Sequence, residues 1–261
     1  MLLEDKKLLI TGVLTDDSIA WHVARVAQEQ GAEIVCTGFG RGMRLTERSV
    51  QRLPSPADVL SLDINDPTQV NELSGELARR WGRVDGALHA IAFAPDDALG
   101  GNFLNTPVES ATTAFATSAF SYKTLAVALR PLLESAGGGG LVTLDFDNSQ
   151  AWPAYDWMGV AKSALQSVTR YLARDLGASN IRVNAVSAGP LGTVAAKSIP
   201  GFDTFERVWL ERAPLRWDPH NPDAVARMIC VLLSDWAPMT TGEVIHVDGG
   251  FHAVAAGVPK G

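Results

Sequence analysis

Residues 8–39 read LLITGVLTDDSIAWHVARVAQEQGAEIVCTGF, and this stretch decides the fold. Its two ends, residues 8–13 and 33–39, are short apolar runs typical of buried strands. Between them, apolar side chains recur at helical spacing over residues 19–30, and Gly31 ends the helix. Such a strand–helix–strand unit joins two parallel strands by a right-handed crossover. The stretch therefore predicts the beginning of a parallel α/β sheet.

The same alternation continues along the chain. Helices are predicted over residues 67–81, 118–133, 155–176 and 222–233, the first of them with Asp66 as N-cap and Pro67 in the first turn. Further strands are predicted over residues 59–64, 86–93, 140–146, 181–187 and 243–247. Several are nearly continuous in Val, Ile, Leu and Ala, as in sheets covered on both faces. We expect an α/β fold: one Rossmann-like, doubly wound parallel sheet of about seven strands, forming a single domain over residues 1–261.

One long stretch, residues 194–219, fits neither pattern and contains the Pro200-Gly201 pair. Long irregular segments in compact domains are usually binding loops or lids. We therefore expect an irregular substrate-binding loop there.

The composition excludes several classes of protein. The 261 residues are 46% hydrophobic and 20% charged, and 22 basic against 29 acidic residues give a net charge of −7. These values are typical of a soluble globular protein, and the acidic excess argues against nucleic acid as the main partner. No signal peptide or membrane-spanning apolar run is evident, which favours a cytoplasmic protein. Cys36 and Cys230 are expected to be buried thiols, and no metal site is expected from the spacing of His, Cys, Asp and Glu.

The turn after the first strand is a candidate phosphate-binding loop. It reads TGVLTDDSIA, residues 11–20, and departs from the usual G-x-G-x-x-G because only Gly12 is a glycine. Gly12 permits a sharp turn, Ser18 can cap the following helix, and the free N–H groups there can bind pyrophosphate. An ordinary capped strand–loop–helix turn explains the same residues equally well.

The ends of the second and third strands carry candidate adenosine contacts. No acidic residue follows the second strand, where one would bind the ribose hydroxyls, but Phe39 could stack on adenine. Arg41 and Arg44 leave NADPH open, or are solvated surface charges. Asp63 and Ile64 could hold the adenine edge, although Asp63 could equally cap a turn.

A tyrosine and a lysine follow the fifth strand. Tyr155 and Lys162 are seven residues apart, which places them on one face of a helix. A tyrosine hydroxyl can donate to a substrate oxygen that gains negative charge during reduction, and a lysine can hold a nicotinamide ribose. An amphipathic helix with one aromatic residue and one solvated lysine is the ordinary alternative. Phe146 could wall the same pocket.

The segment after the sixth strand completes this end of the sheet. Backbone groups of residues 188–193, which include Gly189 and Leu191, could meet a nicotinamide carboxamide, and Thr193 could bind a phosphate. Ser163 lacks the sequence context of a hydrolase nucleophile.

Taken jointly, these motifs resemble a known family. The likeness covers residues 11–20, 91–95, 155–162, 188–190, 232–235 and 241–250, and so nearly the whole chain. It resembles the NADH-dependent enoyl-acyl-carrier-protein reductases, a divergent branch of the short-chain dehydrogenase/reductases. It looks closest to the actinobacterial, isoniazid-target type.

The resemblance implies a homotetramer that reduces trans-2-enoyl thioesters of acyl-carrier protein or coenzyme A with NADH, in type II fatty-acid synthesis. It implies that Tyr155 binds the thioester carbonyl and stabilises the enolate, that Lys162 holds the nicotinamide ribose, and that Phe146 flanks both ligands. The cofactor-binding residues that it implies are Gly12, Ser18, Ile19, Phe39, Asp63, Ile64, Ala92, Lys162, Gly189, Leu191 and Thr193.

Three other functions are weighed against this one. The ketoreductases of the same superfamily pair their tyrosine with a lysine four residues on and a serine thirteen residues before, and here those positions are Gly159 and Val142. Ketone reduction is therefore disfavoured. A catalytically silent NAD(H)-binding regulatory protein on the same fold is the main alternative, and an enoyl-thioester hydratase or isomerase that uses no nucleotide is the third.

Overall fold

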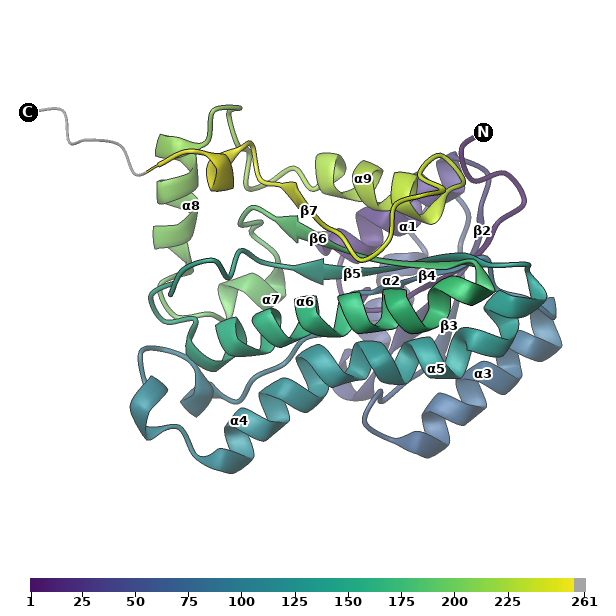
Figure 1. Cartoon of the computed structure of the whole chain (residues 1–261), viewed down its shortest axis with the longest axis horizontal. Coiled ribbons are helices and arrows are strands. Elements are labelled where there is room, and N and C mark those ends of the chain that lie inside the picture. The colour runs from purple at the N-terminus through teal and green to yellow at the C-terminus, as the bar shows by residue number, and fades with distance from the viewer. Residues whose placement is uncertain (256–261) are drawn as a thin grey trace, which may run out of the picture.

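A seven-stranded parallel sheet forms the centre of the molecule (Figure 1). The computed structural model describes residues 1–255. The strand order is β3-β2-β1-β4-β5-β6-β7, so the winding reverses between β1 and β4. This confirms the predicted doubly wound α/β fold. The strands are β1 (Lys7–Ile10), β2 (Glu33–Gly38), β3 (Asp58–Ser61), β4 (Gly86–His89), β5 (Gly139–Asp145), β6 (Ile181–Ala188) and β7 (Val244–Val247).

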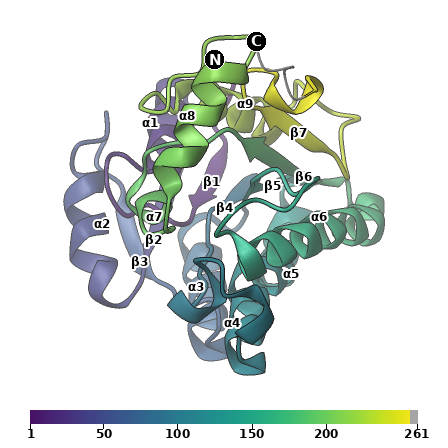
Figure 2. The ribbon, with the colours of Figure 1, turned by 90° about the vertical axis from the view of Figure 1, so that its left-hand side faces the viewer.

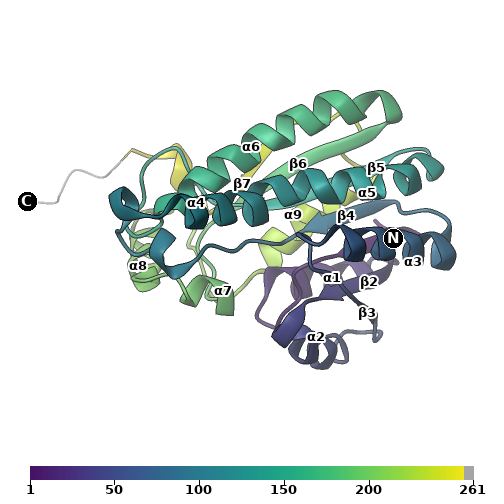
Figure 3. The ribbon, with the colours of Figure 1, turned by 90° about the horizontal axis from the view of Figure 1, so that it is seen from below.

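Helices cover both faces of the sheet (Figures 1 and 3). One face packs against α1 (Ile19–Glu29), α2 (Met43–Val50) and α9 (Asp223–Leu233). The other packs against α3 (Pro67–Trp81), α5 (Ser121–Ser135) and α6 (Asp156–Leu176). Helix α4 (Val108–Phe115) runs into α5 through a π-helical turn, Ala116–Phe120.

The core consists of two apolar clusters, one on each face of the sheet. Neighbouring residues of one strand belong to different clusters: Val142 of β5 lies among the side chains of α1 and α9, and Leu141 among those of α5 and α6. Because successive side chains point to opposite faces, a strand buried on both sides must be apolar throughout. This explains the continuous apolar runs of the sequence.

Local signals fix several helix ends as predicted. The Ser18 hydroxyl accepts from the Trp21 N–H at 3.3 Å at the beginning of α1. Asp66 accepts from the Thr68 N–H at 2.9 Å, with Pro67 as the first residue of α3. Gly82 ends α3 at φ +67°, a left-handed conformation that glycine adopts without a Cβ penalty.

Several strands are shorter than predicted. β1 ends at Ile10 rather than residue 13, β3 at Ser61 rather than 64, and β4 at His89 rather than 93. Their continuations leave the sheet as loops at its carboxyl edge. Apolar character therefore does not mark strand pairing there: Val13, Leu62 and Ile64 are buried in loops, and Phe93 is exposed.

The prediction of an irregular loop over residues 194–219 is wrong. It contains two helices, α7 (Val194–Lys197) and α8 (Phe202–Arg212), which stand in front of the carboxyl ends of the strands in Figure 2. The Thr193 hydroxyl caps α7 by accepting from the Ala196 N–H at 3.1 Å. Phe205 and Trp209, four residues apart, form the buried stripe of α8. Gly201, at φ +73°, separates the two helices.

Both cysteines are buried free thiols, as predicted, and burial raises the pKa of each to about 12. Residues 1–255 contain no cluster of His, Cys, Asp and Glu able to hold a metal ion. None of the described helices has the length and apolar character needed to cross a membrane.

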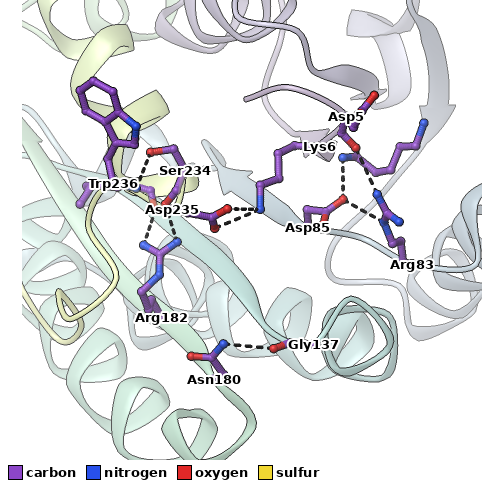
Figure 4. A network of polar contacts seen from close by, with 12 residues as sticks. Asp5, Lys6, Arg83, Asp85, Gly137, Asn180, Arg182, Ser234, Asp235 and Trp236 are labelled. Atoms are coloured by element: carbon purple, nitrogen blue, oxygen red, sulfur yellow. Dashed lines mark hydrogen bonds and ion pairs between the residues drawn. The ribbon is translucent and has the colours of Figure 1, made fainter. Parts of the chain in front are cut away.

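Polar contacts tie the amino edge of the sheet together (Figure 4). Arg182, at the beginning of β6, donates to the carbonyls of Leu232 and Ser234 at 2.6 and 2.8 Å. Lys6 pairs with Asp235 at 2.8 Å. The Asp85 carboxylate accepts from the backbone N–H of Lys7 at 2.8 Å and from the Arg83 side chain at 3.3 Å. These contacts hold β1, β4 and β6 to the end of α9.

Candidate active site

Three adjoining cavities follow the carboxyl edge of the sheet. The largest, about 630 Å³, lies over β1, β2 and β3. It shares Gly12 and residues 90–92 with a middle cavity of about 190 Å³. The middle cavity shares Ile19 and Thr193 with a third of about 130 Å³, beneath α7 and α8. We call the three together the groove. Its lining includes every catalytic and cofactor-binding residue that the family resemblance implies.

Gly12 lies where the winding of the sheet reverses, and its conformation requires glycine. It has φ +77°, and a Cβ there would lie 2.0 Å from the carbonyl oxygen of Ala90. Thr11 fixes the same approach, because its hydroxyl donates to the Leu88 carbonyl at 2.9 Å and accepts from the Ala90 N–H at 3.0 Å. The loops after β1 and β4 therefore meet closely enough to form the floor of the groove.

The beginning of α1 opens into the middle cavity. Ser18, Ile19 and Ala20 line it, and the first turn of α1 contains no acidic residue. Ser18 caps the Trp21 N–H, and the N–H groups before it and the positive end of the helix dipole face the groove. The Thr15 hydroxyl beside them is buried and has no hydrogen-bond partner within residues 1–255. This donor set fits a pyrophosphate group.

The largest cavity is suited to a flat heterocycle. Phe39 lines it with a side chain that is 57% exposed, so one face of the ring is available for stacking. Asp63 and Ile64 line the same cavity. Asp63 also caps a turn, accepting from the Asn65 N–H at 2.9 Å. Arg41, whose side chain is exposed, does not line the cavity.

One hydroxyl fixes the opposite wall of the groove. Ser118, in the π-helical turn between α4 and α5, accepts from the Phe93 N–H and donates to the Phe93 carbonyl, both at 2.9 Å. The segment that contains Ile91 and Ala92 is thereby held against the cavity.

Tyr155 and Lys162 are both buried at the beginning of α6. Their exposed fractions are 6% and 7%. The Lys162 ammonium donates to the Leu144 carbonyl at 2.8 Å, which anchors it to the end of β5. Tyr155 lines the smallest cavity together with Phe146, whose ring meets it edge-on at 5.2 Å between centroids. Gly189 and Leu191 form another wall of that cavity.

The backbone on either side of Tyr155 is strained. Ala154 and Asp156 have φ +61° and +42°, unusual for residues other than glycine. The loop at residues 100–102 holds this conformation: Gly100 donates to the Ala154 carbonyl at 2.9 Å, and Gly101 donates to the Asp156 carboxylate at 2.6 Å. These contacts therefore fix the backbone on both sides of the tyrosine.

Burial and one carboxylate determine the charges around this tyrosine. Burial raises the pKa of Tyr155 far above its usual value, and the nearby Asp145 raises it further. Burial lowers the pKa of Lys162, whereas Asp145 raises it. Burial also raises the pKa of Asp145 itself, to about 6, although Lys162 and Gln166 oppose this shift. At neutral pH the tyrosine is therefore a proton donor.

The sequence analysis missed several residues of the smallest cavity. Ile199, Phe202 and Phe205 line it from the α7–α8 segment, and Asp145 lines it from β5. The spacing of Phe205 and Trp209 was a signal for α8. No pattern singled out Asp145, because its neighbours in space are distant in sequence.

Comparison with known proteins agrees with this geometry. Residues 12–252 match the family model described as enoyl-(acyl carrier protein) reductase. The chain is 44% identical to the enoyl-acyl-carrier-protein reductase (NADH) of Mycolicibacterium smegmatis over 95% of its own length and 97% of the relative. It is 42% identical to the protein of that name from Mycobacterium avium, with the same coverage. It is 36% identical to the one from Bacillus subtilis, over 97% and 98%.

Proposed function

The chain belongs to the enoyl-(acyl carrier protein) reductase family, and we propose that it reduces the trans-2 double bond of enoyl thioesters with NADH. The observation that carries the proposal is the burial of Tyr155 and Lys162 together at the narrow end of the groove. Enoyl groups on acyl-carrier protein or on coenzyme A fit the same chemistry.

Different parts of the groove would bind different parts of the dinucleotide. The beginning of α1 would bind the pyrophosphate, and Phe39, Asp63 and Ile64 would surround the adenine. Lys162 would hold the nicotinamide ribose, and Gly189, Leu191 and Thr193 the remaining polar groups. When bound, NADH supplies a hydride to the β-carbon of the substrate.

Tyr155 donates a hydrogen bond to the thioester carbonyl. The carbonyl oxygen gains negative charge as the enolate forms, so this bond is strongest in the transition state. Phe146 packs against Tyr155 and limits where the thioester can lie. We propose the α7–α8 segment, within residues 194–219, as the substrate-binding lid, because Phe202 and Phe205 close the cavity above Tyr155 and exclude water.

The rival functions fit these residues less well. Val142 occupies the position of the ketoreductase serine and is completely buried in the core. Gly159 provides no amine where that class has its lysine. A silent NAD(H)-binding protein would have no need for a buried tyrosine aimed by a strained backbone.

The test measures NADH oxidation with a trans-2-enoyl thioester beside an acetoacetyl thioester. We expect oxidation with the enoyl substrate alone. Tyr155→Phe should lower kcat by roughly 10²–10³-fold with little change in NADH affinity, because it removes one donor to the developing oxyanion. Tyr171→Phe is the matched control, since that side chain is 60% exposed and lies outside the groove. NADH binding without oxidation would favour the silent protein, and substrate turnover without NADH would favour a hydratase or isomerase.

We also propose a cytoplasmic homotetramer. Helices α4 and α5 form one long helix on the outer surface, and α6 runs beside it (Figure 3). Apolar side chains remain exposed along these helices. A mass near four times 27.8 kDa by light scattering would support this assembly, and a monomer would contradict it. The exposed side chains are Val108, Phe115, Phe120, Val127 and Val160.

A further inference from the structure

Asp145 is a buried carboxylate at the reacting end of the groove to which the mechanism assigns no task. It is the last residue of β5, is 5% exposed, and lines the cavity that contains Tyr155 and Phe146. One of its oxygens, Oδ1, has no hydrogen-bond partner among the described residues. A buried carboxylate with an unmet oxygen costs stability. Its presence there therefore calls for a role.

Helix α6 is joined to the end of β5 by two consecutive contacts. Lys162 and Gln166 are one helical turn apart and point to the same side of α6. The Lys162 ammonium donates to the Leu144 carbonyl at 2.8 Å, and the Gln166 amide donates to Asp145 Oδ2 at 2.7 Å. Gln166 thus orients the Asp145 carboxylate beside the Lys162 ammonium. The carboxylate and the ammonium do not form a direct ion pair.

We propose that Asp145, oriented by Gln166, is a positioning residue that keeps Lys162 charged for the reduction. The proposal rests on the proposed function. A negative charge close to a buried amine favours its ammonium form, and the same charge disfavours the tyrosinate. These are the forms needed to hold the ribose and to donate to the thioester carbonyl. The charges act in the expected directions, since Asp145 raises the pKa of both groups.

The other titratable groups nearby do not replace this carboxylate. Asp147, in the loop after β5, is equally buried and also has one oxygen, Oδ2, without a partner among the described residues. Its Oδ1 accepts from the Ser149 N–H at 3.0 Å, and the side chain does not line the cavity. His89, at the end of β4, has its pKa lowered to about 3 by burial, with Lys162 adding to the shift, and is therefore neutral. His246 of β7 interacts with Asp147.

The experiment measures NADH affinity by fluorescence from about pH 6 to about pH 10, since Lys162 loses its proton towards the alkaline end. In the wild-type protein, affinity should fall as the ammonium is lost. In Asp145→Asn the midpoint of this fall should move down by about one pH unit, because a neighbouring opposite charge shifts a pKa by about that much. Gln166→Met should move it in the same direction by less, because the carboxylate remains and keeps only its longer contact, 3.5 Å from the Asn148 amide.

Asp147→Asn is the matched control, because it removes an equally buried carboxylate from the same loop, and its midpoint should stay in place. The proposal would be overturned if Asp145→Asn had the same midpoint as the wild-type protein. It would also be overturned if Asp147→Asn shifted the midpoint as much as Asp145→Asn does. Should Asp145→Asn fail to fold, Gln166→Met decides alone: a lower midpoint supports the proposal and an unchanged one overturns it. NADH binding without enoyl reduction would refute the proposed function while leaving the midpoint shift measurable.

Discussion

The two edges of the sheet differ in whether their polar side chains have hydrogen-bond or ion-pair partners. At the amino edge, Arg182, Asp85 and Lys6 all have partners within the chain (Figure 4). At the carboxyl edge, Thr15 and Asp145 each have a buried oxygen without one. Every such unpartnered side-chain atom in residues 1–255 belongs to a loop after β1 or β5, to the end of β5, or to α8: these residues are Thr15, Asp145, Asp147, Trp152, Trp209 and Arg212.

The difference distinguishes residues that stabilise the fold, at the amino edge, from residues that serve the function, at the carboxyl edge. An unmet buried polar atom costs about 1–3 kcal/mol, so a cluster of them survives only where a ligand or a reaction uses it. Substitutions at the amino edge should therefore cost stability and leave activity intact. Substitutions at the carboxyl edge should do the reverse.

The largest expected effect is that of Arg182→Met. It leaves the buried carbonyls of Leu232 and Ser234 without donors, and should lower the free energy of unfolding by about 3 kcal/mol. For a chain of this size that corresponds to a melting temperature lower by about 6–12 °C. Calorimetry measures it, with the exposed Arg130→Met as control. A large loss of kcat in the folded variant would break the distinction between the edges.

Lys162→Met tests the opposite edge. Removing the buried ammonium should weaken NADH binding about 100-fold, or about 2.7 kcal/mol, because a charged hydrogen-bond donor to the ribose is lost. The melting temperature should not fall, since burial of this amine is itself unfavourable, as its lowered pKa indicates. Fluorescence titration and calorimetry measure both, with the exposed Lys123→Met as control. A clearly lower melting temperature would place Lys162 among the stabilising residues.

A smaller, pH-dependent effect is expected for the stability of Asp145→Asn. Burial raises the pKa of Asp145 to about 6, so its protonated form is favoured in the folded state. The wild-type protein therefore gains stability from this group as the pH falls through about 6 and loses it as the pH rises. Near pH 7.5 the variant should be more stable by about 2 kcal/mol, and the difference should shrink near pH 4.5. Urea unfolding at both pH values measures it, and a constant difference would contradict the assignment.

The smallest effect is expected from Asp235→Asn. The carboxylate pairs with Lys6 at 2.8 Å, but its side chain is 78% exposed. Solvent-exposed ion pairs contribute less than about 1 kcal/mol, and here we expect at most about 0.5 kcal/mol. The midpoint of urea unfolding should barely change, and NADH affinity should stay the same. A loss well above that value would mean that the amino edge depends on charge rather than on buried hydrogen bonds.

The sequence predicted most of the fold because its signals are local. Continuous apolar runs marked the strands, and Asp66 with Pro67 marked the beginning of α3. Helix α2 was missed because tertiary hydrogen bonds, not apolar spacing, hold its buried side. Thr46 and Ser49 donate to the carbonyls of Val13 and Leu14, at 2.5 and 3.2 Å, in a loop about 30 residues earlier.

The residues of the candidate site likewise divide into those that local sequence signals could predict and those that depend on tertiary contacts. Tyr155 and Lys162 could be paired from the sequence because one helix carries both, and the motif residues of each strand end meet at one edge by topology. Asp145 and Phe205 could not be placed. The first depends on Gln166, from another element, and the second on the fold of the α7–α8 segment over the sheet.

The π-helical turn at Ala116–Phe120 has a consequence for insertions and deletions. Such a turn amounts to one extra residue within a continuous helix, here the one running through α4 and α5. Deleting one of its residues would remove that extra residue and restore ordinary winding, with the parts before and after it still nearly aligned. Deleting a residue elsewhere in the helix would instead rotate everything before the deletion by about 100° relative to everything after it, and the outward faces of α4 and α5 would lose their alignment. The turn is therefore the place where this helix tolerates the loss of a residue, at the expense of the contacts between Ser118 and Phe93.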